Sequence, residues 1–149
     1  MTTRYVHTNI VSEDWQALAR FYQEVFDCQP VPPQRNLSGD WLTRGTGVPG
    51  AAFQGMHLRL PGYGEDGPTL EIYQYSVFEP NDEPIANRKG YGHIAFRVDD
   101  VTAVRDEVLK RGGAELGQIV EADLPGVGHL TFVYLTDPEG NILEIQNWS

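Results

Sequence analysis

Two histidines and two glutamates occupy matching positions in the two halves of the chain. His7 and His93 each begin a segment with alternating apolar residues, and Glu71 and Glu144 each stand between Leu and Ile. A carboxylate between bulky aliphatic residues of a strand is unfavourable unless a positive charge balances it. Imidazole and carboxylate groups together suit a divalent metal ion. The four residues therefore predict one metal site.

The repetition of this pattern gives it weight, because a lone histidine or glutamate on a half-exposed strand is usually only solvated or hydrogen-bonded. Residues 5–7 (Tyr-Val-His) align with residues 91–93 (Tyr-Gly-His) at an offset of 86, from 93 − 7. Residues 70–72 and 143–145 are both Leu-Glu-Ile, at an offset of 73, from 144 − 71. Loops of different length absorb the difference. We infer that the chain is a duplication.

The elements that carry the first pair follow from hydrophobic periodicity. Residues 4–11 alternate as a strand, and an amphipathic helix from Asp14 to about Phe26 is expected next, capped by Ser12 or Glu13. Three further strands are predicted between turn-rich stretches, near residues 38–44, 51–60 and 68–76.

The second half predicts a similar order. A strand over residues 91–98 precedes a helix that Asp99 or Asp100 caps and that stops at Gly112-Gly113. The turn at residues 137–141 (Asp-Pro-Glu-Gly-Asn) then leads into the last strand. The Pro, Asn and Asp-rich stretch between the halves reads as a linker.

The strand period of two places all four predicted ligands on one side, because residues i and i+2 share a face. In each half the apolar neighbours of the histidine and the glutamate point the other way, toward the helices. The expected fold class is α+β, with two βαβββ modules forming a cupped, mostly antiparallel sheet and the helices on its outer face. We expect a single domain over residues 1–149, with modules at about 4–77 and 90–148 and a linker at about 78–89.

The composition limits the partners and the compartment. The chain has 149 residues with 11 Lys and Arg against 21 Asp and Glu, and this net charge of −10 disfavours nucleic acid and anionic membranes as partners. The only cysteine is Cys28, so no intrachain disulfide is possible. No apolar run reaches the roughly 20 residues that a spanning helix requires. We expect a cytoplasmic protein.

The whole chain resembles the vicinal oxygen chelate superfamily, which includes glyoxalase I, methylmalonyl-CoA epimerase, extradiol dioxygenases and antibiotic-resistance proteins. The resemblance rests on residues 5–10, 70–72, 92–96 and 136–144, the last containing Asp-Pro-Glu-Gly-Asn ahead of Glu144. It implies paired βαβββ modules around a cup, a small-molecule substrate with vicinal oxygens, and a homodimer. The modules of this family pair within one chain or across two, and the sequence leaves both arrangements open.

The ligand set most resembles that of glyoxalase I-like lactoylglutathione lyases. Four ligands with two carboxylates imply one Ni, Co, Mn or Zn ion with two positions open for substrate. The chemistry implied is a lyase or isomerase reaction that moves a proton next to a carbonyl through a metal-bound enediolate. Glu144 is the expected base and Glu71 its near-symmetric partner; the alternative is that both remain structural ligands.

Glutathione-using glyoxalases tend to carry an Arg four residues beyond the first metal His, and Val11 at that place argues against glutathione.

Three other functions remain open for the same fold. An epimerase like methylmalonyl-CoA epimerase is the second choice. A ring-cleaving dioxygenase would use Fe and leave the position of Glu71 outside the metal shell. A resistance protein would sequester a small molecule without turnover.

The substrate pocket is the least defined part of the prediction. Tyr73 and Tyr75 share the face of Glu71, and Arg59 or Arg97 would meet an anionic substrate. Aromatic residues at such spacings more often serve packing than recognition. His129 is expected to be a pocket-wall or surface residue. The residues expected to line the pocket are Trp41, Phe53, His57, Arg59, Tyr73, Tyr75 and Arg97.

Overall fold

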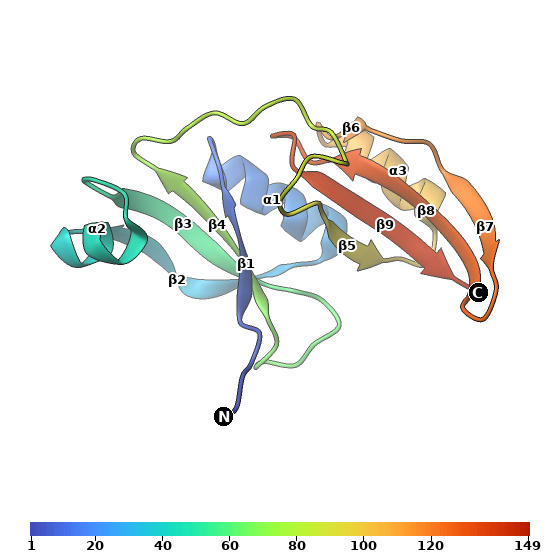
Figure 1. Ribbon diagram of the computed structural model, residues 1–149, viewed down its shortest axis with the longest axis horizontal. Coiled ribbons are helices and arrows are strands. Elements are labelled where there is room, and N and C mark those ends of the chain that lie inside the picture. The colour runs from blue at the N-terminus through green and yellow to red at the C-terminus, as the bar shows by residue number, and fades with distance from the viewer. The chain divides into compact units, whose positions relative to one another are not determined.

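The computed structural model describes residues 1–149 as two compact units, Met1–Pro80 and Asn81–Ser149 (Figure 1). The division falls inside the predicted linker at 78–89. None of the helices combines the length and the apolar character needed to cross a membrane. Each unit builds its own sheet, so the two are described in turn.

Unit 1 contains a four-stranded sheet with the strand order β1-β4-β3-β2. Strands β1 and β4 are parallel, whereas the β2–β3 and β3–β4 pairs are antiparallel. Helix α1 follows β1, and α2 lies between β2 and β3. The elements are β1 (His7–Val11), α1 (Trp15–Phe26), β2 (Gln29–Ser38), α2 (Asp40–Thr46), β3 (Ala52–Arg59) and β4 (Thr69–Tyr75).

Unit 2 repeats this plan in a five-stranded sheet in which β5, β9, β8 and β6 lie in that order and β7 also pairs with β8. Again the first and last strands, β5 and β9, are parallel and the other pairs are antiparallel. The elements are β5 (Ile94–Arg97), α3 (Val101–Lys110), β6 (Ala114–Glu115), β7 (Val120–Leu124), β8 (Gly128–Thr136) and β9 (Ile142–Trp148). The predicted α+β fold of βαβββ modules is confirmed.

The two long helices begin in the same way, at positions 86 residues apart. The Asp14 carboxylate accepts a hydrogen bond from the Ala17 amide at 3.1 Å, and the Asp100 carboxylate accepts one from the Ala103 amide at 2.9 Å. Each carboxylate satisfies one of the amides that the first helical turn leaves without a partner. The prediction that Ser12 or Glu13 caps α1 is therefore wrong, and Asp14 is the cap. For α3 the candidates were Asp99 and Asp100, and Asp100 is the cap.

The hydrophobic core of unit 1 lies on the face of its sheet that α1 covers. Leu18 and Tyr22 of α1 are 1% and 0% exposed, and the aliphatic residues that alternate along β3 and β4, Leu58, Leu70 and Ile72, are fully buried. In unit 2 the counterparts on β9 are Leu143 and Ile145, also fully buried. This alternation leaves the odd-numbered residues of β3 and β4 on the opposite face, which we call the open face of unit 1.

One predicted strand is wrong: residues 38–44 do not form a strand. Strand β2 ends at Ser38, and α2 runs over Asp40–Thr46. The helix is held locally by the Arg44 guanidinium, which donates to the Asp40 carboxylate at 2.7 Å one turn earlier, and Gly47 ends it in the left-handed region at φ 73°. Trp and Thr favour strands, and in seven residues this preference hides the helical pattern.

The turn before β9 is organised by the buried carboxylate of Asp137, which is 1% exposed. Its Oδ1 accepts hydrogen bonds from the amides of Glu139 at 2.9 Å and Asn141 at 3.0 Å, and the Asn141 amide group donates to Oδ2 at 2.9 Å. Gly140 adopts φ 86°, which favours glycine. The turn thus fixes where β9, and with it Glu144, begins.

We expect Asp137→Ala to lower the free energy of unfolding by about 2–3 kcal/mol, because two part-buried backbone amides and the Asn141 side chain lose their acceptor. Urea unfolding at neutral pH measures this change. Asp137→Asn is the matched control: it keeps one side-chain oxygen at the same place, and we expect it to retain at least half of the stability that the alanine variant loses. Equal stability of the wild-type protein and Asp137→Ala would contradict this role for the turn.

Candidate metal site

Glu71 lies at the centre of the open face of unit 1. Strand pairing sets it beside Asn9 of β1 on one side and His57 of β3 on the other. Directly paired residues of neighbouring strands point to the same face, so the three side chains converge. Glu71 is only 6% exposed, which makes it a buried carboxylate in need of hydrogen-bond donors or a cation.

Four side chains contact the Glu71 carboxylate. His7 Nε2 lies 3.2 Å from Oε1, and Asn9 Nδ2 donates to the same oxygen at 3.3 Å. The other oxygen, Oε2, accepts a hydrogen bond from the Tyr73 hydroxyl at 3.1 Å and lies 2.9 Å from His57 Nε2. His57 Nε2 also hydrogen-bonds the Tyr73 hydroxyl. Both carboxylate oxygens are therefore held in place.

Burial shifts the proton affinities of the groups around Glu71. The pKa of His57 is lowered, chiefly by burial; Glu71 opposes this shift, and the positive charges of Arg35 and His7 add to it. The pKa of Tyr73 is raised well above its usual value by burial, by the negative charge of Glu71 and by the hydrogen bond to it. Tyr73 therefore serves as a hydrogen-bond donor at neutral pH.

An aromatic cluster adjoins the carboxylate. The Phe53 ring stacks on Tyr73 with centroids 4.2 Å apart, and Tyr75 contacts Phe53 at 5.2 Å. Leu42 of α2 packs on this cluster and covers part of the open face. Of the predicted pocket residues, Phe53, Tyr73 and Tyr75 thus lie together on the open face, although Phe53 and Tyr73 are buried in packing.

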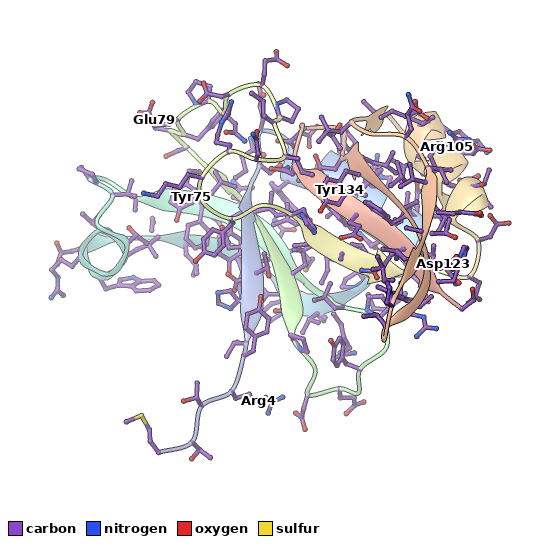
Figure 2. The ribbon with its side chains drawn as sticks, turned by 45° about the vertical axis from the view of Figure 1, so that its right-hand side comes forward. Arg4, Tyr75, Glu79, Arg105, Asp123 and Tyr134 are labelled. Carbon is purple, nitrogen blue, oxygen red and sulfur yellow. The ribbon has the colours of Figure 1, made fainter.

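Unit 2 contains the second predicted pair. His93 Nε2 lies 3.0 Å from Glu144 Oε2, and the Glu144 side chain is 13% exposed. Glu144 pairs across the strands with Tyr134 of β8, labelled in Figure 2, and the His93 ring lies 4.6 Å from the Tyr134 ring. The position that His57 occupies beside Glu71 is therefore occupied by Tyr134 beside Glu144.

The four predicted ligands thus form two His–Glu pairs, one in each unit. Each pair joins a histidine just before or at the start of the first strand to a glutamate on the strand parallel to it. Imidazole nitrogen and carboxylate oxygen suit a divalent cation, and the donor chemistry of both pairs fits one. Within either unit, no three His, Cys, Asp or Glu side chains are arranged to hold an ion by themselves.

The remaining predicted residues have varied surroundings. Trp41 lies on α2, 56% exposed, with its indole donating to the Ser38 carbonyl, so it is not on a strand facing Glu71. Arg59 lies on the open face, in register with Thr69. Arg97 of β5 donates to the Trp148 carbonyl. His129 is an exposed neighbour of Asp123, at 2.7 Å, as expected of a surface residue.

Sequence reasoning missed two residues of the open face. Asn9 lies two positions beyond His7, and the strand period alone would have placed it on the same side. Arg35 of β2 pairs with Gly55, and its position could not be foreseen because a β-bulge between Val31 and Arg35 shifts the register.

Gly55 makes room for this arrangement. A β-carbon there would lie 2.0 Å from the Ile72 carbonyl oxygen and 2.7 Å from Tyr73 Cδ1. Only a residue without a side chain lets the Tyr73 ring lie over β3 and reach Glu71.

The model of the Glyoxalase/Bleomycin resistance protein/Dioxygenase superfamily matches residues 4–145. The chain belongs to this superfamily. Its members act on small molecules, generally with a divalent metal ion, and membership supports a glyoxalase- or dioxygenase-like function. The superfamily contains many enzymes and also non-enzymatic resistance proteins.

Solved structures of superfamily members share the fold. A glyoxalase family protein from Bacillus cereus is 17% identical, with a TM-score of 0.75 over 98% of this chain and 93% of its own. A glyoxalase/dioxygenase from Nostoc punctiforme is 19% identical, with a TM-score of 0.66 over 98% and 91%. A glyoxylase/bleomycin resistance protein/dioxygenase domain from Frankia sp. is 18% identical, with a TM-score of 0.59 over 100% and 98%. No curated protein matches the chain significantly.

We expect Tyr73→Phe to lower the free energy of unfolding by about 1 kcal/mol, because the buried Glu71 carboxylate loses a hydrogen-bond donor while the ring packing stays intact. Chemical denaturation of the metal-free protein measures it. Tyr75→Phe is the control from the same aromatic cluster, whose hydroxyl has no partner in the structure; we expect a change below about 0.5 kcal/mol. Equal effects of the two variants would count against the hydrogen bond.

We expect Gly55→Ala to destabilise the protein by about 1–3 kcal/mol, since the added methyl group collides with the backbone of β4 and with Tyr73. Gly45→Ala in α2, where a β-carbon meets nothing within 4 Å, should leave stability unchanged or raise it. Thermal unfolding of both variants makes the comparison. A fully stable Gly55→Ala protein would show that β3 and β4 are not this close.

Proposed function

We propose that this protein is a metal-dependent lyase or isomerase that moves a proton next to a carbonyl group of a small substrate with vicinal oxygens. His7, Glu71, His93 and Glu144 would hold one divalent ion, Ni, Co, Mn or Zn. The observation that supports this most is the repeated contact of a histidine with a glutamate, 3.2 Å in unit 1 and 3.0 Å in unit 2.

Under this proposal the two pairs would complete one site, with the modules paired within one chain or across a homodimer. A bound ion supplies Lewis-acid polarisation of the substrate carbonyl, which makes the neighbouring carbon-bound proton more acidic. The aromatic residues of the open face, Tyr73 and Tyr75, would border the substrate. We propose the cytoplasm as the protein's compartment, since its single cysteine, Cys28, is free and a reducing environment suits a chain without disulfides.

The surroundings of the two glutamates favour different roles. Glu71 is held at both oxygens by Asn9, Tyr73 and two histidines, which leaves its carboxylate little freedom to turn. Glu144 contacts His93 alone within hydrogen-bonding distance and is more exposed. A base must rotate toward the substrate, take a proton from one carbon and return it to the next. We therefore assign proton transfer to Glu144 and a fixed ligand role to Glu71.

Metal content separates these roles. We expect plasma mass spectrometry to find about one divalent ion for each four-residue set of His7, Glu71, His93 and Glu144 in the native protein. The Glu71→Gln variant should lose most of this metal. Glu144→Gln should retain part of the metal but lower the turnover of a hemithioacetal, and the exchange of its carbon-bound proton with solvent, by at least about 100-fold.

His129→Gln is the control for adventitious metal, because His129 also contacts carboxylates but lies on the exposed β7–β8 hairpin. It should keep metal and turnover. Absence of metal from the native protein even after reconstitution would overturn the proposal. Metal without turnover in the wild-type protein would remove the lyase assignment and leave a sequestering protein.

A ring-cleaving dioxygenase is the second candidate, and one observation favours it. Glu71 Oε2 is already engaged by His57 and Tyr73. If these contacts persist, His7, His93 and Glu144 form a set of two histidines and one carboxylate that suits Fe²⁺. Oxygen consumption by the ferrous protein with a catechol, unaffected by Glu71→Gln, would select this candidate over the first.

A further inference from the structure

The open face of unit 1 carries two arginines on either side of Glu71. Strand pairing places the residues of this face in three successive rows. The first row holds Arg35, Gly55 and Tyr73, the second holds His57 and Glu71, and the third holds Arg59 and Thr69. Gly55 and Arg59 are four positions apart on β3, a span of about 13 Å at the usual rise of a strand. The arginines therefore flank the predicted metal ligand.

Arg59 is half-buried without a carboxylate partner. Its Nε is fully shielded from solvent and has no hydrogen-bond partner, and no acidic group lies within ion-pair distance of its guanidinium. A shielded N–H without an acceptor is unfavourable, and arginine is rarely buried unless something pairs with it. An anion bound beside Arg59 would supply the charged partner that its guanidinium lacks.

Arg35 is also half-buried and has no carboxylate partner. Its guanidinium donates to the nearby Pro33 carbonyl, which leaves further N–H groups for a ligand. Its charge acts on both His57 and Tyr73, so it lies close to the groups that hold Glu71.

Arginines that are both half-buried and without a carboxylate partner stand out in a chain of net charge −10, and Arg35 and Arg59 share one face. Arg44, Arg88, Arg105 and Arg111 each contact a carboxylate. The one acidic residue in the rows between Arg35 and Arg59 is Glu71, and a metal ion would use its charge. We propose that the substrate carries an anionic oxygen group, a carboxylate or a phosphate, which Arg35 and Arg59 bind. This inference rests on the proposed function and adds the substrate class.

The test uses three hydroxamates that present the same two vicinal oxygens to a metal: neutral acetohydroxamate, N-hydroxysuccinamate with a carboxylate tail, and its phosphonate analogue. Calorimetry on the protein reconstituted with Ni²⁺ gives their affinities. We expect at least one anionic probe to bind about tenfold or more tightly than acetohydroxamate, as a charge-assisted hydrogen bond allows. Whichever anionic probe is preferred identifies the group.

The variants locate the effect. Arg35→Gln and Arg59→Gln combined should abolish the preference for the anionic probe and leave acetohydroxamate binding unchanged. Arg20→Gln, which removes the same charge from the exposed side of α1 behind the sheet, should leave both unchanged. Equal affinity of all three probes, or a preference that survives in the double variant, would overturn the inference and leave the metal site standing. Failure of acetohydroxamate itself to bind would overturn the proposed function, and this inference with it.

Discussion

The buried carboxylate of Glu71 is the constraint on which the open face of unit 1 depends. An ionised carboxylate at 6% exposure is stable in a strand only when donors or a cation replace the water it has lost. Asn9, Tyr73 and two histidines take that place. Each of them has its own requirement: Tyr73 reaches the carboxylate because residue 55 is a glycine, and Asn9 does because β1 runs parallel to β4 in one register.

The two units repeat one plan of strands, but their glutamates, Glu71 and Glu144, have different neighbours. The same parallel pairing of first and last strands brings a histidine to a glutamate in both units, so the backbone alone accounts for the pairs. The neighbours differ, since His57 stands beside Glu71 where Tyr134 stands beside Glu144. A fixed carboxylate and a freer one are what a reaction needs when one group holds an ion and another moves a proton. One repeated plan of strands with different neighbours thus provides both.

Local patterns predicted much of this fold from the sequence. Strand alternation placed Glu71 and Glu144 opposite their Leu and Ile neighbours, because the period of two is a property of the backbone. Helix α2 was missed, since seven residues are too few for a helical period to appear, although the Asp40–Arg44 spacing was a signal for it. The contacts of His57 were also missed, because its register against Glu71 depends on the loop between β3 and β4.

The proposed metal ligands and the two unpaired arginines depend on different parts of the fold. The proposed metal-ligand positions follow from strand alternation and occur in both units of this chain, so they point to a class of chemistry and not to a substrate. Residues such as Arg35 and Arg59 depend on a bulge in β2 and on the far end of β3, which nothing in the module's plan requires. Because an unpaired guanidinium reduces stability unless a ligand pairs with it, these two positions are where we propose that the substrate's anionic group binds.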